Sequence, residues 1–192
     1  MGVLLHQQGR NAEAVERICQ AIALNGSDSR YHANLGIAYR ELDRHAEAAA
    51  SFERAIELKP DNATAHNNLG IIRLEQGLPE EARRSFELAR KFRSRDPEVH
   101  LNLARALMAE GRRDLAMEQF RKTLELDPNC VDARIGLGAA LYDSGLREEA
   151  RPELEEALRL KPDSPEALVQ FGKILIEEDE LEEALRLFER SI

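Results

Sequence analysis

The sequence has no tryptophan, and only 5% of its 192 residues are aromatic. Charged residues, by contrast, make up 33%. This composition suits long helices with solvent-facing sides better than a β-sandwich, so it favours an all-α fold.

Long apolar runs are also absent. None approaches the roughly 20 residues of a membrane-spanning helix, so we expect no insertion into a membrane. Residues 1–5 resemble the start of a signal peptide, but they carry no basic leader, and Gly2, Leu5 and Gly9 already match the repeat described below.

Motifs of catalysis are missing as well. The chain contains no P-loop and no G-x-S-x-G, H-E-x-x-H or C-x-x-C motif. Its Asp and Glu residues are spaced like helix caps and i,i+4 surface pairs, so no general acid–base pair can be singled out. We expect no enzymatic activity and no cofactor.

Basic residues are outnumbered, and the net charge of −9 weighs against nucleic acid as a partner, because phosphate binding needs concentrated Lys and Arg. One cluster departs from this trend and consists of Arg83, Arg84, Arg90, Lys91, Arg93 and Arg95. It is either a docking patch for an acidic partner or a solvated helix face that nearby glutamates partly neutralise.

What the sequence does contain is a repeat of 34 residues, for which residues 63–96 are the template. We predict two short helices there, the first carrying Leu69 and Gly70 and the second carrying Ala82 and Phe86. Pro79 suits the first turn of the second helix. The turn residue between the helices recurs as Gly9, Asp43, Gly77, Gly111, Gly145 and Asp179.

The period, the Leu-Gly step, the Ala-x-x-x-Phe spacing and the closing Pro60, Pro128 and Pro162 resemble the tetratricopeptide repeat (TPR). The resemblance implies a right-handed α-α superhelix, a solenoid of antiparallel helix pairs that forms a single domain over the whole chain. Its parts are a partial repeat at 1–28, full repeats at 29–62, 63–96, 97–130 and 131–164, and a partial repeat at 165–192. Neither end offers a polar capping repeat, so we expect a piece of a longer protein.

Small residues at fixed places let two helices approach closely. We expect glycines of the first helix to face alanines of the second, in the pairs Gly36 and Ala48, Gly70 and Ala82, and Gly138 and Ala150. Further from this close approach, we expect the space between the helices to be filled by the aromatic rings of Tyr39, Phe52, Phe86 and Phe120.

Cysteines and histidines offer no site. Cys19 and Cys130 lie three repeats apart, beyond disulfide reach, so we predict free thiols and a reducing, cytoplasmic location. His32, His66 and His100 recur at the repeat period, about one helix-packing distance apart, which is too far to share a zinc ion. We predict no metal site and expect these rings to replace a large aromatic residue, with one edge towards water.

The predicted binding surface is the concave groove, which in TPR proteins is lined by the first helices. Each first helix points a stripe into it at i, i+3, i+4, i+7 spacing, and the floor of that stripe is largely apolar. Aligned apolar surface commonly marks a partner site. The predicted peptide-binding residues are Asn34, Ile37, Asn67, Asn68, Ile71, Leu74, Leu101, Asn102, Arg105, Met108, Ile135 and Tyr142.

Asn34, Asn68 and Asn102 occupy one place in three successive repeats, where their amides could bond to the backbone of an extended peptide. This resembles the asparagine ladder of O-linked N-acetylglucosamine transferase TPR superhelices, to whose repeats residues 66–70 are similar. Gly136 and Gln170 break the ladder. The alternative is that these amides only satisfy neighbouring groups between helices.

A second TPR binding mode, the dicarboxylate clamp for chaperone C-termini, does not fit. The last two positions of the clamp motif are Lys and Arg in such proteins, and the corresponding residues here are Asp132 and Gly136. Acidic residues along one rim would also repel a carboxylate, namely Glu41, Glu75, Asp143 and Glu177.

We therefore predict a non-catalytic scaffold that binds a protein or peptide in its groove. One alternative is the substrate-recruiting arm of a larger enzyme, such as a glycosyltransferase. Another is self-association through the uncapped ends, where Val3, Leu4, Leu185 and Ile192 could bury against another copy.

Overall fold

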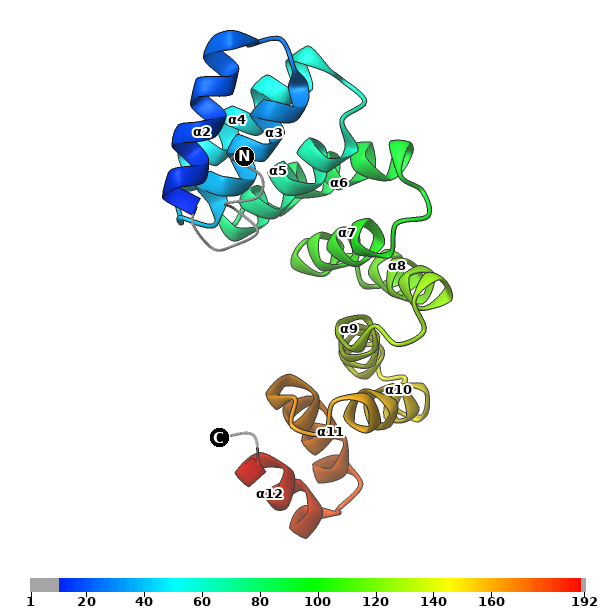
Figure 1. Ribbon diagram of the computed structural model, residues 1–192. Helices are drawn as coiled ribbons and strands as arrows, with labels where there is room; N and C mark the ends of the chain where they lie inside the picture. The colour runs from blue at the N-terminus through cyan, green and yellow to red at the C-terminus, as the bar shows by residue number, and fades with distance from the viewer. Residues whose placement is uncertain (1–10, 191–192) are drawn as a thin grey trace. The chain divides into compact units, whose positions relative to one another are not determined.

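A computed structural model describes residues 11–190, the side chain of Arg190 excepted, and every regular element in that range is a helix (Figure 1). The all-α prediction is confirmed, and the helices form the antiparallel pairs of a TPR solenoid. The predictions for Gly2, Val3, Leu4, Leu5, Gly9 and Ile192 lie outside the described residues. Within them, no helix is long and apolar enough to cross a membrane.

The chain divides into two compact units, and unit 1 comprises residues 1–94. Its described helices are α2 (Asn11–Leu24), α3 (Ser29–Arg40), α4 (His45–Leu58), α5 (Ala63–Glu75) and α6 (Pro79–Phe92). In each pair the first helix packs on the second, α3 on α4 and α5 on α6. The helix pair predicted within residues 63–96 is confirmed, with Pro79 in the first turn of α6.

Unit 2 comprises residues 95–192. Its helices are α7 (Pro97–Ala109), α8 (Arg113–Leu126), α9 (Val131–Asp143), α10 (Arg147–Leu160), α11 (Pro165–Glu177) and α12 (Leu181–Arg190). The first helices α7, α9 and α11 contact one another in sequence, so they form one continuous face, with α8 and α10 behind it (Figure 1). We call the surface of the first helices in each unit its first-helix face.

The turns inside the pairs follow the predicted pattern. Gly77, Gly111 and Gly145 have φ between 74° and 79°, and Asp43 and Asp179 have φ of 55° and 65°. This left-handed backbone favours glycine, because a Cβ there meets the following carbonyl oxygen. The repeating turn residue is thus a conformational requirement, which the two aspartates meet under strain.

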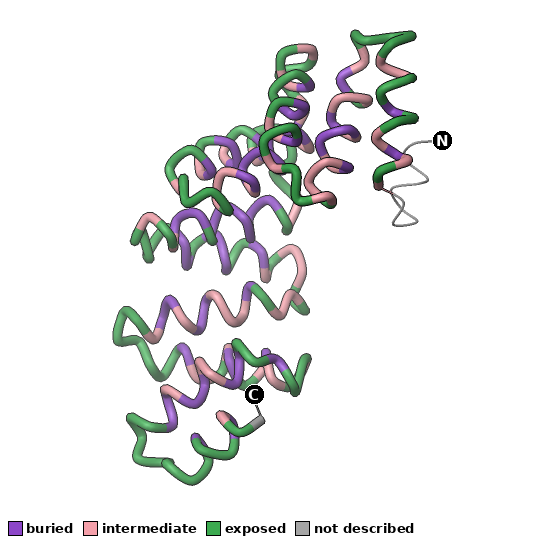
Figure 2. Tube along the Cα trace, turned by 90° about the vertical axis from the view of Figure 1, so that its left-hand side faces the viewer, coloured by how far each residue is buried: buried purple, intermediate pink, exposed green. Residues whose placement is uncertain are grey.

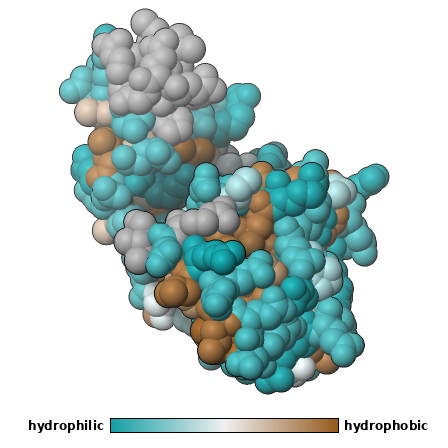
Figure 3. Space-filling model, turned by 90° about the horizontal axis from the view of Figure 1, so that it is seen from below, coloured by the Kyte–Doolittle hydropathy of each residue, from teal (hydrophilic) through white to brown (hydrophobic). Residues whose placement is uncertain are grey.

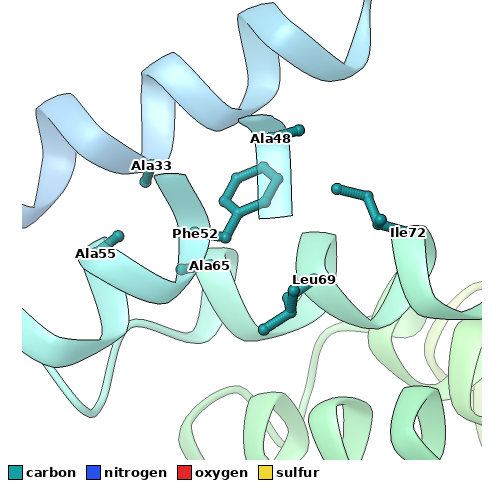
Figure 4. Close-up of a cluster of buried hydrophobic side chains, with 7 residues drawn as sticks. All are labelled: Ala33, Ala48, Phe52, Ala55, Ala65, Leu69 and Ile72. Atoms are coloured by element: carbon teal, nitrogen blue, oxygen red, sulfur yellow. The ribbon is translucent and has the colours of Figure 1, made fainter. Parts of the chain in front are cut away.

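In each unit the core lies between the helices of a pair and between neighbouring pairs of the same unit. In unit 1, Phe52 is fully buried among alanines from α3, α4 and α5, with Leu69 and Ile72 beside it (Figure 4). Buried residues recur along every complete helix pair on the sides that face neighbouring helices (Figure 2). Within each unit a pair leaves apolar surface that the next pair of that unit covers, so stability accumulates along the unit.

At the glycines of the Leu-Gly step, the atoms nearest to an added Cβ belong to a large side chain of the second helix, and the predicted pairing with alanines stays a prediction. A Cβ on Gly36 would lie 2.7 Å from the Phe52 ring, and one on Gly70 would lie 2.6 Å from the Phe86 ring. In α9, Gly138 faces Leu154 in the same way. The glycine is needed because the ring of the same repeat fills the space of its missing side chain.

Repeat 97–130 breaks this rule and the next repeat compensates. Ala104 replaces the glycine and is fully buried, so the Phe120 ring cannot occupy that space. The ring lies instead against Gly136 of α9, where any Cβ would overlap it. In unit 1 the place equivalent to Gly136 holds Asn68, and the Phe52 ring lies against Gly36 instead. The break in the asparagine ladder at Gly136 therefore has a packing cause.

Two local features were missed in the sequence. First helices begin with a side-chain cap from Asp28, Asn62, Asp96 and Ser164, but Cys130 at the start of α9 provides none. Pro152 lies inside α10, where a proline cannot donate the backbone hydrogen bond of an α-helix.

Candidate peptide-binding face

In unit 1, the predicted groove residues lie on the first helices α3 and α5. Asn34, Ile37, Ile71 and Leu74 are partly exposed. Asn67 and Asn68 are buried, each with 7% of its surface exposed, because α5 is covered on several sides. Ile37 also packs on the core around Phe52, so it supports the fold as well as lining the face.

Asn68 is already engaged in a hydrogen-bond network. Its Oδ1 accepts from Arg40 Nη1 at 2.5 Å, and its amide nitrogen donates to the carbonyl oxygen of Thr64 at 2.9 Å. The first contact links α3 to α5 across two repeats. This geometry agrees with the alternative in which the asparagine amides satisfy neighbouring groups, and a peptide would have to displace Arg40 to reach Asn68.

In unit 2, the predicted residues lie on α7 and α9. Leu101 and Asn102 are buried, Met108, Ile135 and Tyr142 are partly buried, and Arg105 is exposed. Arg105 Nη2 pairs with Asp132 Oδ2 at 2.6 Å, which ties α7 to α9. The Tyr142 hydroxyl donates to Glu177 Oε1 at 2.7 Å and ties α9 to α11; this hydrogen bond to a carboxylate raises the pKa of Tyr142.

A cavity of about 240 Å³ opens on the first-helix face of unit 2. Phe120, Ile135 and Gly136 supply its apolar walls, and Arg105, Asp132 and Glu166 surround it with charge. Gly136 is one of its lining residues, and the Phe120 ring lies where a Cβ of residue 136 would be. Ile135 and Arg105 were predicted from the sequence, whereas the roles of Gly136, Phe120 and Glu166 were missed. The signal was present in the paired departures from the repeat at residues 104 and 136.

The predicted acidic rim is largely neutralised. Within the described residues, Glu41 pairs with Arg40 at 3.2 Å and Asp143 pairs with Arg113 at 3.9 Å. Glu75 Oε2 lies 3.5 Å from His45 Nδ1. Glu177 pairs with Arg147. Three of these pairs join the end of a first helix to the start of the preceding second helix, so they also hold successive repeats together.

The three periodic histidines are structural. His66 Nε2 donates to the carbonyl oxygen of Pro60 at 2.9 Å, and its ring stacks on Phe92 with 6.3 Å between centroids. His100 Nδ1 bonds to Gln119 Oε1 at 2.9 Å. Both rings are buried, which corrects the expectation of an edge towards water; only His32 is partly exposed.

The thiols of Cys19 and Cys130 are free, as predicted. Partial burial raises the pKa of Cys130. Over residues 11–190, no group of three or more His, Cys, Asp or Glu side chains is arranged to hold a metal ion.

The basic cluster is partly paired within unit 1. Arg83 Nη1 bonds to Glu87 Oε1 at 2.8 Å, and Arg90 and Arg93 also have partners. Arg84 and Lys91 are exposed, and the Lys91 ammonium lies over the Phe92 ring at 5.7 Å. These contacts agree with a solvated helix face, and a docking role for the cluster stays a prediction.

Comparison with protein families gives three matches to tetratricopeptide models. Residues 36–77 match one described as "TPR repeat", and residues 101–165 and 141–192 match two described as "Tetratricopeptide repeat". Together they cover more than half of the chain. They match the repeat in general, and the closer similarity to the glycosyltransferase repeats stays a prediction. No curated protein gives a significant sequence match.

Several solved structures share this fold. YrrB, described as "a TPR protein with an unusual peptide-binding site", has a TM-score of 0.78 and 23% identity over 93% of this chain and 92% of its own. MamA has a TM-score of 0.74 and 20% identity over 82% and 92%. PilF of Pseudomonas aeruginosa has a TM-score of 0.76 and 22% identity over 85% and 76%.

Proposed function

We propose that this chain, which belongs to the tetratricopeptide repeat family, is a non-catalytic scaffold that binds an extended peptide segment of a partner protein on its first-helix faces. The observation that carries the proposal is the set of apolar side chains left partly exposed there. They are Ile71 and Leu74 in unit 1 and Met108 and Ile135 in unit 2.

Covering these side chains with a partner is favourable, because burial of apolar surface contributes about 25 cal/mol per Å². They stand beside the polar contacts of Arg40 and Arg105, which can orient a peptide backbone or side chain. The similarity to a TPR protein with a peptide-binding site supports the same use of the fold here.

The proposal is tested by selecting binders from a random peptide display library with the whole chain. We expect selected peptides to lose affinity at least tenfold when Leu74→Glu or Met108→Glu puts a charge on the face. The matched control is Leu88→Glu, which changes an exposed leucine of the second helix α6. If no peptide is selected, or if only Leu88→Glu reduces binding, the proposed function is wrong.

The asparagines need a separate test, because two of them are buried. Asn34 is partly exposed, and no described residue bonds to its amide. Asn34→Ala should therefore weaken binding of a selected peptide without changing the melting temperature. Asn68→Ala should lower the melting temperature as well, since it removes the bond that links Arg40 of α3 to α5.

Substrate recruitment for an enzyme remains the second proposed function, supported by the recurring Asn34, Asn68 and Asn102. It requires a catalytic domain in the same gene, so the flanking sequence decides between an enzyme arm and a free scaffold. Self-association is a further proposal. The surface in Figure 3 is mostly polar with scattered apolar side chains, and Leu181 and Leu185 of α12 are exposed. Light scattering that shows only monomer at high concentration would contradict it.

A further inference from the structure

The cavity of unit 2 lies where two residues of the chain, Ala104 and Gly136, depart from the repeat pattern of unit 1. Ala104 is buried where unit 1 has Gly36, the Phe120 ring lies against Gly136, and the cavity is lined by both Phe120 and Gly136. The first-helix face of unit 1, where Gly36 and Asn68 occupy the equivalent places, follows the ordinary pattern.

The size of the cavity limits its occupant. Sites for whole small molecules measure roughly 300–1,000 Å³, whereas this one measures about 240 Å³. An apolar cavity of about 150 Å³ is enough to hold benzene. The ring of Phe120 and the side chain of Ile135 therefore suit one apolar or aromatic side chain.

The charge of unit 2 favours particular peptide residues beside the anchoring side chain. Unit 2 has 14 Lys and Arg residues against 23 Asp and Glu residues, while unit 1 has 13 of each, so unit 2 carries the whole net charge of −9. At the cavity, Asp132 is paired with Arg105, but no described residue forms an ion pair with Glu166. An acidic surface of this kind favours Lys or Arg next to the anchoring side chain.

We infer that this cavity, lined by Phe120, Ile135 and Gly136, anchors an apolar side chain of a partner peptide in which a basic residue stands beside the anchor, with Glu166 pairing with the basic residue. The inference rests on the proposed function and adds the class of peptide. It requires no movement of buried groups, because the cavity is already open.

The test uses a synthetic peptide, acetyl-Gly-Ser-Lys-Phe-Lys-Ser-Gly-amide, titrated into the whole isotope-labelled chain and followed by NMR. We expect the backbone amide of Gly136 and the methyl groups of Ile135 to shift. Replacing the peptide's Phe by Ser should weaken binding about tenfold, and replacing both Lys by Glu should weaken it at least as much.

Substitutions in the protein also test whether the cavity anchors the peptide. Glu166→Gln should weaken binding about threefold, while Glu148→Gln should leave it unchanged, since Glu148 holds the equivalent place in the first turn of α10, outside the cavity. The double variant A104G/G136N restores the ordinary residues of the repeat, so it should keep its melting temperature and lose the preference for Phe over Ser.

Three outcomes overturn the inference. If the Phe and Ser peptides bind equally, or if shifts appear away from Gly136, the cavity is not the anchor site, and the scaffold proposal still stands on the display experiment. If this peptide does not bind although the library yields other binders, the inferred peptide class is wrong. Failure of both experiments overturns the proposed function as well.

Discussion

A single missing Cβ decides where an aromatic ring lies in this chain. Gly36 and Gly70 accept the Phe52 and Phe86 rings of their own repeats, and Gly138 accepts Leu154. The Leu-Gly step of the sequence is therefore half of a contact whose other half lies 16 residues later.

Gly70→Ala tests this contact. The added methyl would lie 2.6 Å from the Phe86 ring, so we expect the free energy of unfolding in urea to fall by about 1–3 kcal/mol. Adding Phe86→Leu should recover part of the loss, since leucine can turn its branches away. A double variant less stable than both single variants would contradict the contact.

Asp28 gives the chain a pH dependence. Its carboxylate caps α3 and bonds to Arg30, and these bonds lower its pKa from 3.8 to about 2. A lowered pKa in the folded state means that the stabilisation is present above pH 3.8 and is lost as the pH falls towards 2.

The variant Asp28→Asn keeps a capping side chain but cannot titrate. We expect the parent chain to lose stability relative to this variant between pH 4 and pH 2, measured as the urea midpoint at each pH. A constant difference over that range would show that the cap does not titrate as described.

At the scale of helices, α9 lacks the cap that the other first helices have. Cys130→Asp should supply it and raise the free energy of unfolding by about 1 kcal/mol, as measured by urea denaturation. The matched control is Asp96→Ala, which removes the existing cap of α7 and should lower stability by a similar amount. An unchanged urea midpoint in Cys130→Asp would contradict the assignment.

Pro152 is the other departure at this scale. The equivalent place in α8 holds Glu118, and both residues are exposed, so no core contact requires the proline. Pro152→Glu should restore a backbone hydrogen bond and stabilise the chain by about 1–3 kcal/mol, seen as a higher midpoint in thermal melting followed by circular dichroism. A lower midpoint would mean that the proline stabilises α10.

Helices and turns could be predicted from the sequence better than the burial of individual side chains on the first-helix faces. Helix pairs and turns could be predicted because Gly77 and its equivalents are required locally, within one repeat. The burial of Asn68 and His66 could not, because it depends on how closely neighbouring helices approach. The cavity was missed because Ala104 and Gly136 each look like an isolated departure, and only the position of the Phe120 ring connects them.

At the scale of the molecule, charge is distributed unevenly, and this has a measurable effect. Like charges in unit 2 repel one another, and salt screens that repulsion. Raising NaCl from about 20 mM to about 500 mM should slow hydrogen exchange in peptides from 95–192 more than in peptides from 11–94, as measured by mass spectrometry. Equal slowing of exchange in both units would contradict the predicted effect of charge repulsion in unit 2.

The link between Ala104 and Gly136 through the Phe120 ring has a consequence for how the repeats of this chain can be rearranged. Repeats are usually treated as interchangeable modules that can be deleted, duplicated or grafted one at a time. Here a graft of residues 97–130 alone would bring a phenylalanine whose ring needs a glycine in the module that follows. Residues 97–164 should therefore be grafted or deleted together, as one pair of repeats.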